Sequence, residues 1–142
     1  LATAYFARPA TPGGAIFGIE MRPSLASDDK LFERLPKLMQ SMGDLANHIQ
    51  TLRRGDRSLG GLDGQEMLTK INADGVTAYI FIWETKGKPD AVLYPNTHIE
   101  LQIGGERNEQ TDKRESSVLS EDEALSLWNS ILNSFHIRPG AV

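Results

Sequence analysis

LSEDEALSLWNSILNSF, residues 119–135, is the stretch that decides the fold of this chain. Ser120 followed by Glu123 has the spacing of a capping box, in which two side chains satisfy backbone amides at a helix start. The apolar residues after it recur every three or four positions, as on one face of a helix: Leu125, Trp128, Ile131, Leu132 and Phe135. The segment predicts an amphipathic helix that ends the domain and lies on a sheet.

Upstream of this helix, four segments have the composition of β-strands, at 49–59, 65–72, 77–84 and 97–103. The links between them are short and rich in turn residues, which favours antiparallel neighbours. Residues 77–83 are apolar on both faces and predict a central strand with cover on both sides. The strand at 97–103 alternates apolar and polar residues, so one of its faces should be wetter. We expect a sheet whose two faces are covered unequally.

The first part of the chain adds a strand and a helix. Residues 1–14 hold prolines and glycines among small residues and predict an irregular arm or interdomain linker, before a strand at 15–21. Ser27-Asp28-Asp29 offers a helix start, and an apolar stripe then runs from 31 to 49. Pro36 interrupts this stripe and should kink or split the helix, because proline lacks an N–H.

Together these elements predict one α+β domain over residues 15–142, in the order β-α-β-β-β-β-α. An antiparallel sheet of about five strands carries the two long helices. This arrangement is similar to that of PsbP-like domains, an analogy of fold that implies no function.

The composition narrows the class of protein. The chain has 142 residues, a formal net charge of −4 and no cysteine. The acidic balance argues against general nucleic-acid binding, and the missing cysteines exclude disulfides and thiolate chemistry. The longest apolar run is far shorter than the roughly 20 residues that a membrane helix needs.

The sequence shows no pattern of a catalytic or metal site. It lacks the Gly-x-Ser-x-Gly pentapeptide of an α/β-hydrolase nucleophile. None of His48, His98 and His136 is paired with a second histidine at ligand spacing, so we expect structural roles for all three. His98 and Glu100 share a strand face, but two ligands do not make a metal site. We expect no enzymatic activity and no cofactor.

Three further residues are expected to be structural. Trp83 ends the central strand and Trp128 lies on the helical stripe, so both should be in the core. Glu66 follows the glycine-rich turn at 60–64, and we expect its carboxylate to bind backbone amides of that turn, because a buried carboxylate needs partners.

Two charged groups are candidates for contacts with a protein partner. In the first, Arg53 and Arg57 share one face of a strand while Arg54 points away. A solvated strand end is the first interpretation of this cluster, and an acidic partner surface is the more specific alternative. The second group lies in the polar segment 104–117, which has no periodicity and should either bind something or be a solvated or disordered loop. Its candidate residues are Glu106, Arg107, Asp112, Lys113, Arg114 and Glu115.

Several of these motifs together resemble the C-terminal domain of the Tli family of immunity proteins. The resemblance spans residues 14–142 and rests on the terminal helix with its RPGAV ending and on three upstream motifs. These are Arg53-Arg54-Gly55, Gly61-Leu62-Asp63-Gly64-Gln65-Glu66 and Phe81-Ile82-Trp83-Glu84.

The family resemblance implies a function. Tli proteins partner phospholipase effectors of bacterial type VI secretion systems, are generally exported to the periplasm, and often carry another domain before this one. The resemblance therefore implies a non-catalytic inhibitor that blocks the active site or lid of a lipase-type effector. The alternative is a PsbP-like periplasmic accessory domain that inhibits nothing.

Overall fold

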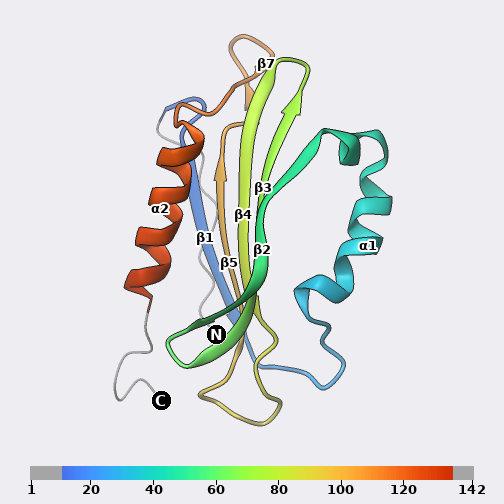
Figure 1. Cartoon of the computed structure of the whole chain (residues 1–142), viewed down its shortest axis with the longest axis vertical. Coiled ribbons are helices and arrows are strands. Elements are labelled where there is room, and N and C mark those ends of the chain that lie inside the picture. Colours follow the sequence, from blue (N-terminus) through green and yellow to red (C-terminus); the bar gives the residue numbers. More distant parts are fainter. Residues whose placement is uncertain (1–10, 136–142) are drawn as a thin grey trace.

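The computed structural model describes residues 11–135 of the chain. Residues 1–10 of the expected arm, His136 and the RPGAV ending lie outside the described residues. A five-stranded antiparallel sheet forms the centre of the domain (Figure 1). Its strands are β1 (Ala15–Arg22), β2 (Ile49–Leu59), β3 (Leu62–Ala73), β4 (Val76–Thr85) and β5 (Asn96–Ile103).

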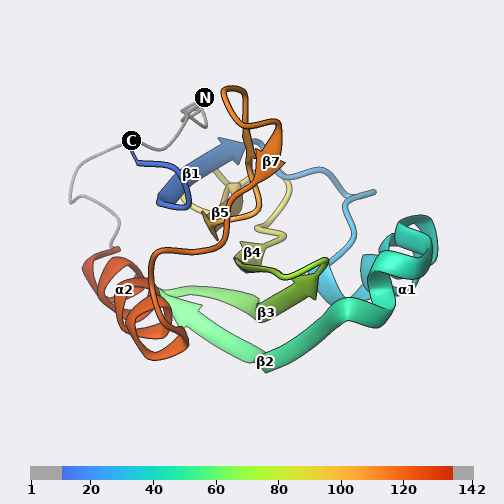
Figure 2. The same cartoon turned by 90° about the horizontal axis from the view of Figure 1, so that it is seen from above.

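The strands lie side by side in the order β1-β5-β4-β3-β2, so β4 is central as predicted. The helices are α1 (Leu31–Met42), which continues into a 3-10 helix η1 (Gly43–His48), and α2 (Glu121–Ser134). Figures 1 and 2 show α1 and α2 on opposite sides of the sheet. The predicted α+β class and the order β-α-β-β-β-β-α are confirmed.

The core lies between α2 and the sheet. Both Trp83 on β4 and Trp128 on α2 are completely buried, as expected, and the Trp128 ring packs edge-on against Phe81 with ring centroids 5.9 Å apart. Ser120 caps α2 by accepting a hydrogen bond from the Glu123 amide, and Glu123 accepts one from the Ser120 amide in return. The predicted capping box is confirmed, and it fixes where the helix begins.

Glycine is required at position 64, where β3 passes over the ring of Trp83. A Cβ atom at this position would lie 2.4 Å from the Trp83 ring, so only glycine allows the close approach. The indole N–H of Trp83 donates to the Arg57 carbonyl on β2 at 2.8 Å. Gly64 thus allows Trp83 to pack against β3 and to donate a hydrogen bond to β2.

The opposite face of the sheet is less well covered, as expected. In α1 only Leu31 is buried, while Leu38 remains 47% exposed. Figure 2 shows α1 standing apart from the central strands. The helix is held mainly at its N-terminal end, where the Phe32 amide donates to Gln65 on β3 at 3.0 Å.

Two expectations about the first helix need correction. The helix begins at Leu31 rather than at 27–29, because the Asp28 carboxylate accepts from the Leu25 amide and binds Arg22 instead of capping a helix. Of the two effects expected of Pro36, a kink or a split, the split is wrong, because Pro36 lies inside the single helix α1. The α-helix ends at Met42, and the next residue, Gly43, has a positive φ of 59°, which suits glycine.

The segment 104–117 is also more regular than its sequence indicates. It contains a two-stranded antiparallel hairpin of β6 (Arg107–Asn108) and β7 (Lys113–Arg114). The tight turn between these strands places Asp112 at a positive φ of 59°. The hairpin lies beside the β3–β4 end of the sheet, where the Ser117 amide donates to the Thr77 carbonyl at 2.8 Å.

Candidate functional site

On the α2 side of the sheet, Glu66 is the centre of a buried polar cluster. Its carboxylate accepts hydrogen bonds of 2.7 Å from Arg53, Arg57 and the indole of Trp128. Burial alone would raise the pKa of Glu66, but the bonds from Arg53, Trp128 and Arg57 outweigh it and lower the pKa. Glu66 is therefore an ionised anchor between β2, β3 and α2.

The structural role expected of Glu66 is real, but its predicted partners were wrong. The carboxylate binds side chains of β2 and α2 rather than amides of the glycine-rich turn. Side chains alternate between the two faces of a strand, and Glu66 points to the α2 face. The strand register places it opposite Gly55 on β2, between Arg53 and Arg57.

The arginine cluster is divided between the two faces of β2, as predicted. Arg53 and Arg57 both reach Asn129 on α2, at 2.9 and 3.3 Å, in addition to Glu66. Arg54 lies on the other face, with its guanidinium 4.3 Å from the centre of the Phe32 ring on α1. All three guanidinium groups therefore have intramolecular partners, and their role in partner binding stays a prediction.

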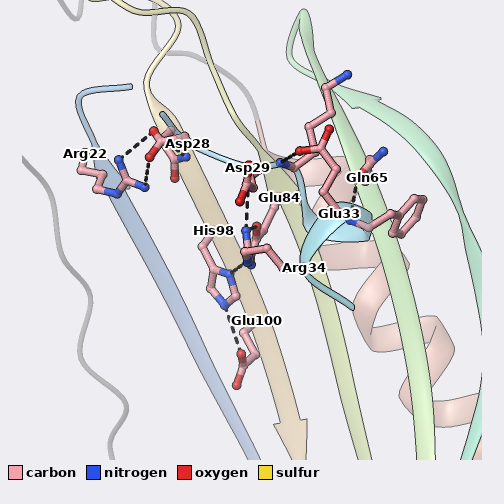
Figure 3. Close-up of polar contacts among 12 residues, drawn as sticks. Arg22, Asp28, Asp29, Glu33, Arg34, Gln65, Glu84, His98 and Glu100 are labelled. Atoms are coloured by element: carbon pink, nitrogen blue, oxygen red, sulfur yellow. Dashed lines mark hydrogen bonds and ion pairs between the residues drawn. The ribbon is translucent and has the colours of Figure 1, made fainter. Parts of the chain in front are cut away.

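On the α1 side, a second polar cluster joins α1 to the sheet (Figure 3). Arg34 makes two hydrogen bonds to the Glu84 carboxylate, at 2.8 and 2.7 Å. His98 bridges two acids, with 2.7 Å from Nδ1 to Glu84 and 3.0 Å from Nε2 to Glu100. One helix residue and three strand residues thus form a continuous chain of charges.

The two acids keep His98 protonated. Burial alone would lower the pKa of His98, but hydrogen bonds with Glu100 and Glu84 outweigh it and raise the pKa to about 9. Burial would raise the pKa of Glu84, yet its bonds with His98 and Arg34 lower that pKa to about 2. The cluster is therefore a charged network near neutral pH.

Sequence reasoning found only the His98 and Glu100 part of this network. The missing signal is the strand register, which places Glu84 directly opposite His98 on the same face. Next to the network, Arg22 binds Asp28 through two bonds of 2.9 Å, and this holds the pKa of Asp28 at about 2. These contacts order the loop that leads into α1.

The β6–β7 hairpin brings together the second group of predicted partner-binding residues. Arg107 donates to Asp112 at 2.8 Å, Asn108 donates to Glu115 at 2.9 Å, and Arg114 donates to the Gly105 carbonyl at 2.7 Å. Glu106 accepts from the Gly13 amide. These bonds order the hairpin, and Lys113 extends from it beside an open hollow.

This hollow has a volume of about 690 Å³ and lies on the α1 side of the sheet. Its floor is largely apolar, with Ile71, Ala78 and Ile80 contributed by β3 and β4. Lys113 and Arg114 lie on its rim. The hairpin thus places two cations next to apolar surface, which is the combination that protein partners often contact.

Two further features of residues 11–135 concern metal binding and membrane spanning. Residues 11–135 contain no cluster of three or more His, Cys, Asp or Glu side chains that could hold a metal ion. Over the same range, neither α1 nor α2 combines the length and hydropathy that a helix needs to cross a bilayer.

The fold is similar to that of immunity proteins from type VI secretion systems. The chain belongs to the family of the Tle cognate immunity protein 4 C-terminal domain, whose model matches residues 2–140. No curated protein matches the chain.

Three solved structures are similar over most of the chain. The apo structure of the immunity protein TplEi from Pseudomonas aeruginosa is 31% identical, with a TM-score of 0.70 over 89% of this chain. TplEi complexed with "L" peptide is 30% identical, with a TM-score of 0.73 over 94%. The Tle4–Tli4 complex is 30% identical, with a TM-score of 0.74 over 94%.

The chain spans less than half the length of each of these structures. It covers 40% of apo TplEi, 46% of TplEi with the peptide and 44% of the matched chain in the Tle4–Tli4 complex.

Proposed function

We propose that this chain binds and inhibits a lipase-type effector of a type VI secretion system, without any chemistry of its own. The observation that carries the proposal is membership of the Tle cognate immunity protein 4 C-terminal domain family over residues 2–140. The likeness to the Tle4–Tli4 complex over 94% of the chain supports binding as the mode of action.

The mechanism we propose is occupancy of the effector surface around its active site or lid. Protection requires a complex that outlasts encounters with small amounts of toxin. We therefore expect a dissociation constant below about 1 nM and an interface near the standard size of about 1,600 Å². By the same family relationship, we propose that the encounter takes place in the periplasm.

The contact residues proposed from the sequence are those of the β6–β7 hairpin, with the Arg53–Arg57 strand end as the second choice. The exposure of the hairpin and the two cations on the rim of the apolar hollow support its choice. Arg53 and Arg57 are already engaged by Glu66, so a partner acid would have to compete with a buried carboxylate at 2.7 Å.

The test is a direct binding measurement with the purified lipase-type effector encoded beside the gene of this protein. We expect co-elution in size-exclusion chromatography and a calorimetric stoichiometry of one to one. A lipase effector of an unrelated type VI system serves as the control and should not bind. Absence of binding to the cognate effector would favour the accessory-domain alternative.

The non-catalytic part of the proposal needs its own assay. The purified protein should not hydrolyse phospholipid or ester substrates. Turnover that survives a second purification would contradict an inhibitor that acts by binding alone.

A further inference from the structure

A short segment before β1 contacts the root of the β6–β7 hairpin. Residues 11–14 form a tight turn, in which the Gly14 amide donates to the Thr11 carbonyl at 2.9 Å; we name these four residues the arm turn. Gly13 and Gly14 are both buried. Gly13 bonds to Glu106 across 93 residues of sequence, so the arm turn and the hairpin meet only in the folded chain.

Gly13 holds both sides of the hairpin at once. Its amide donates to the carboxylate of Glu106, the residue just before β6. Its carbonyl accepts from the amide of Val118, after β7, at 2.9 Å. The Gly14 carbonyl accepts from the Gly104 amide, at the end of β5, at 3.5 Å. One residue thus joins the segments that enter and leave the hairpin.

Only glycine fits at position 13. Its φ is +79°, and a Cβ atom there would lie 2.2 Å from the Ser116 carbonyl oxygen and 3.2 Å from the Val118 side chain. The backbone on this side is itself held, because the Ser117 amide donates to the Thr77 carbonyl at 2.8 Å. The Thr77 amide in turn donates to the Ser116 hydroxyl at 3.0 Å. The root therefore lies fixed between the arm turn and the start of β4.

The carboxylate of Glu106 points inward at this root. Its Oε1 accepts from the Gly13 amide, and its Oε2 is buried without a hydrogen-bond partner among residues 11–135. Neither oxygen is therefore presented to a cation of a partner protein. A buried, unpaired carboxylate oxygen is costly for stability. Proteins break such local rules mainly at functional sites, which indicates a role beyond stability for Glu106.

The root decides where the hairpin cations lie. The strands β6 and β7 have two residues each, and none of the residues 107–114 is buried, so the hairpin has no core of its own. Arg114 also donates to the Gly105 carbonyl at the root, at 2.7 Å. Lys113, Arg114 and Asp74 all line the hollow of about 690 Å³. The position of these cations beside the hollow thus depends on how the root is held.

We propose that Gly13 and Glu106 are positioning residues for the effector contact. They fix the direction of the β6–β7 hairpin, and so the places of Lys113 and Arg114, without touching the effector. Resting on the proposed function, this role of Glu106 replaces the direct contact expected from the sequence. A hairpin that is ordered in advance loses little conformational entropy on binding, so more of its contact energy appears as affinity.

Two substitutions of Glu106 in the whole protein separate support from contact. Glu106→Gln keeps an oxygen that can accept from the Gly13 amide, whereas Glu106→Ala removes it. In Glu106→Ala the amides of Gly105 and Glu115, which close the root, should exchange with deuterium about 10-fold faster or more. Association with the purified effector should slow roughly threefold, because the hairpin must first be ordered. Glu106→Gln should match the wild type in both measurements.

A second background shows whether the effect passes through the hairpin cations. In the double variant Lys113→Glu/Arg114→Glu, the root no longer directs cations toward the effector. Adding Glu106→Ala there should cause no further slowing of association, although the hairpin amides should still exchange faster. A residue that only stabilised the domain would slow association equally in both backgrounds.

Gly13→Ala gives an independent test, with Gly61→Ala as its matched control. Gly61 has a φ of +81° in the turn between β2 and β3, at the opposite end of the sheet from the hairpin (Figure 1), and an added Cβ there meets nothing within 4 Å. Both substitutions carry a similar backbone cost, but only Gly13→Ala displaces the root. Faster hairpin exchange and slower association are expected for Gly13→Ala alone, with the exchange of the α2 amides unchanged in both variants.

The possible failures are distinguishable. If the wild type does not bind the effector, the proposed function and the positioning role both fail. If the wild type binds and Glu106→Gln slows association as much as Glu106→Ala, Glu106 is a contact residue and the positioning role alone is overturned. Hairpin exchange that is unchanged in Glu106→Ala, or equal slowing of association in both backgrounds, would also overturn it.

Discussion

The indole nitrogen of Trp128 lies 2.7 Å from a carboxylate oxygen of Glu66 and donates a hydrogen bond to it across the boundary between α2 and β3. Both residues are buried, and the same carboxylate is held by Arg53 and Arg57 from β2. One buried carboxylate thus joins the terminal helix to two strands. The Trp128 ring meanwhile fills the apolar space beside Phe81.

Trp128→Ala should strongly destabilise the domain. The substitution empties a completely buried site and removes one donor from Glu66, so we expect a loss of about 3–5 kcal/mol in the free energy of unfolding. Trp128→Phe keeps most of the apolar volume and should lose less, about 1–3 kcal/mol. Urea denaturation measures both; since both variants lack the indole N–H, equal losses would mean that the apolar volume of Trp128 does not contribute as described.

Ser120→Ala should remove the N-terminal cap of α2. The Ser120 hydroxyl accepts from the Glu123 amide at 3.2 Å, and losing such a cap costs about 1 kcal/mol. Ser126, exposed in the middle of the same helix, gives the control, because Ser126→Ala removes no cap. Melting curves of the two variants should differ, and effector binding should be unchanged in both. Identical curves would count against the cap.

The α1-side network predicts a pH dependence with two limbs. The pKa of His98 is raised from 6.5 to about 9, so its stabilising effect is complete below pH 6.5 and is lost as the pH rises toward 9. The pKa of Glu84 is lowered from 4.5 to about 2, so its effect is complete above pH 4.5 and is lost as the pH falls toward 2. The free energy of unfolding should therefore be highest between pH 4.5 and 6.5.

The alkaline limb can be assigned to His98 by mutation. We expect a loss on the order of 2 kcal/mol in the free energy of unfolding between pH 6.5 and 9, measured by urea titration. His98→Gln should flatten this limb, whereas His48→Gln, at an exposed position on η1, should retain it. An alkaline limb of unchanged size in His98→Gln would show that another group causes the loss.

Reversing the hairpin cations tests the contact region proposed on the β6–β7 hairpin. The double variant Lys113→Glu/Arg114→Glu should keep the fold, because substitutions at exposed sites usually change stability by no more than about 0.5 kcal/mol. Effector association should slow roughly 3- to 10-fold, with a weaker dependence on salt, since exposed charges act mainly on the association rate.

The single variant Lys113→Glu can be matched with Lys37→Glu on the exposed side of α1. The association rate with the effector is measured on a surface at two salt concentrations. It should be lower for Lys113→Glu than for the wild type and unchanged for Lys37→Glu. Equal association rates for the two variants would show that the effector contacts lie elsewhere than on the hairpin.

The sequence predicted those parts of the fold that have a periodic signal. The capping box at Ser120 and the apolar stripe through Trp128 gave the terminal helix, and the apolar run ending at Trp83 gave the central strand. The first helix was misplaced at its start, because Asp28 has the composition of a helix cap but pairs with Arg22. Its partners, Arg22 and the Leu25 amide, lie only six and three residues before Asp28, but the composition of the segment does not show that they replace the helix cap.

The side-chain networks were predicted less completely. Glu66 was expected to have a structural role, but its partners come from 13, 9 and 62 residues away in the chain. The exposure of Val92 and Leu93 was not anticipated, because these two residues alone have the pattern of any short apolar pair. Only the structure shows that the loop leaves them exposed.

The central claim is inhibition by occupancy, and a titration of effector activity tests it most directly. Hydrolysis of phospholipid vesicles by the purified effector would be followed while this protein is added at ratios from below to above one to one. Inhibition by a complex tighter than about 1 nM predicts a linear fall that ends in complete inhibition at an equimolar ratio. Full effector activity at a tenfold excess of folded protein would contradict the account.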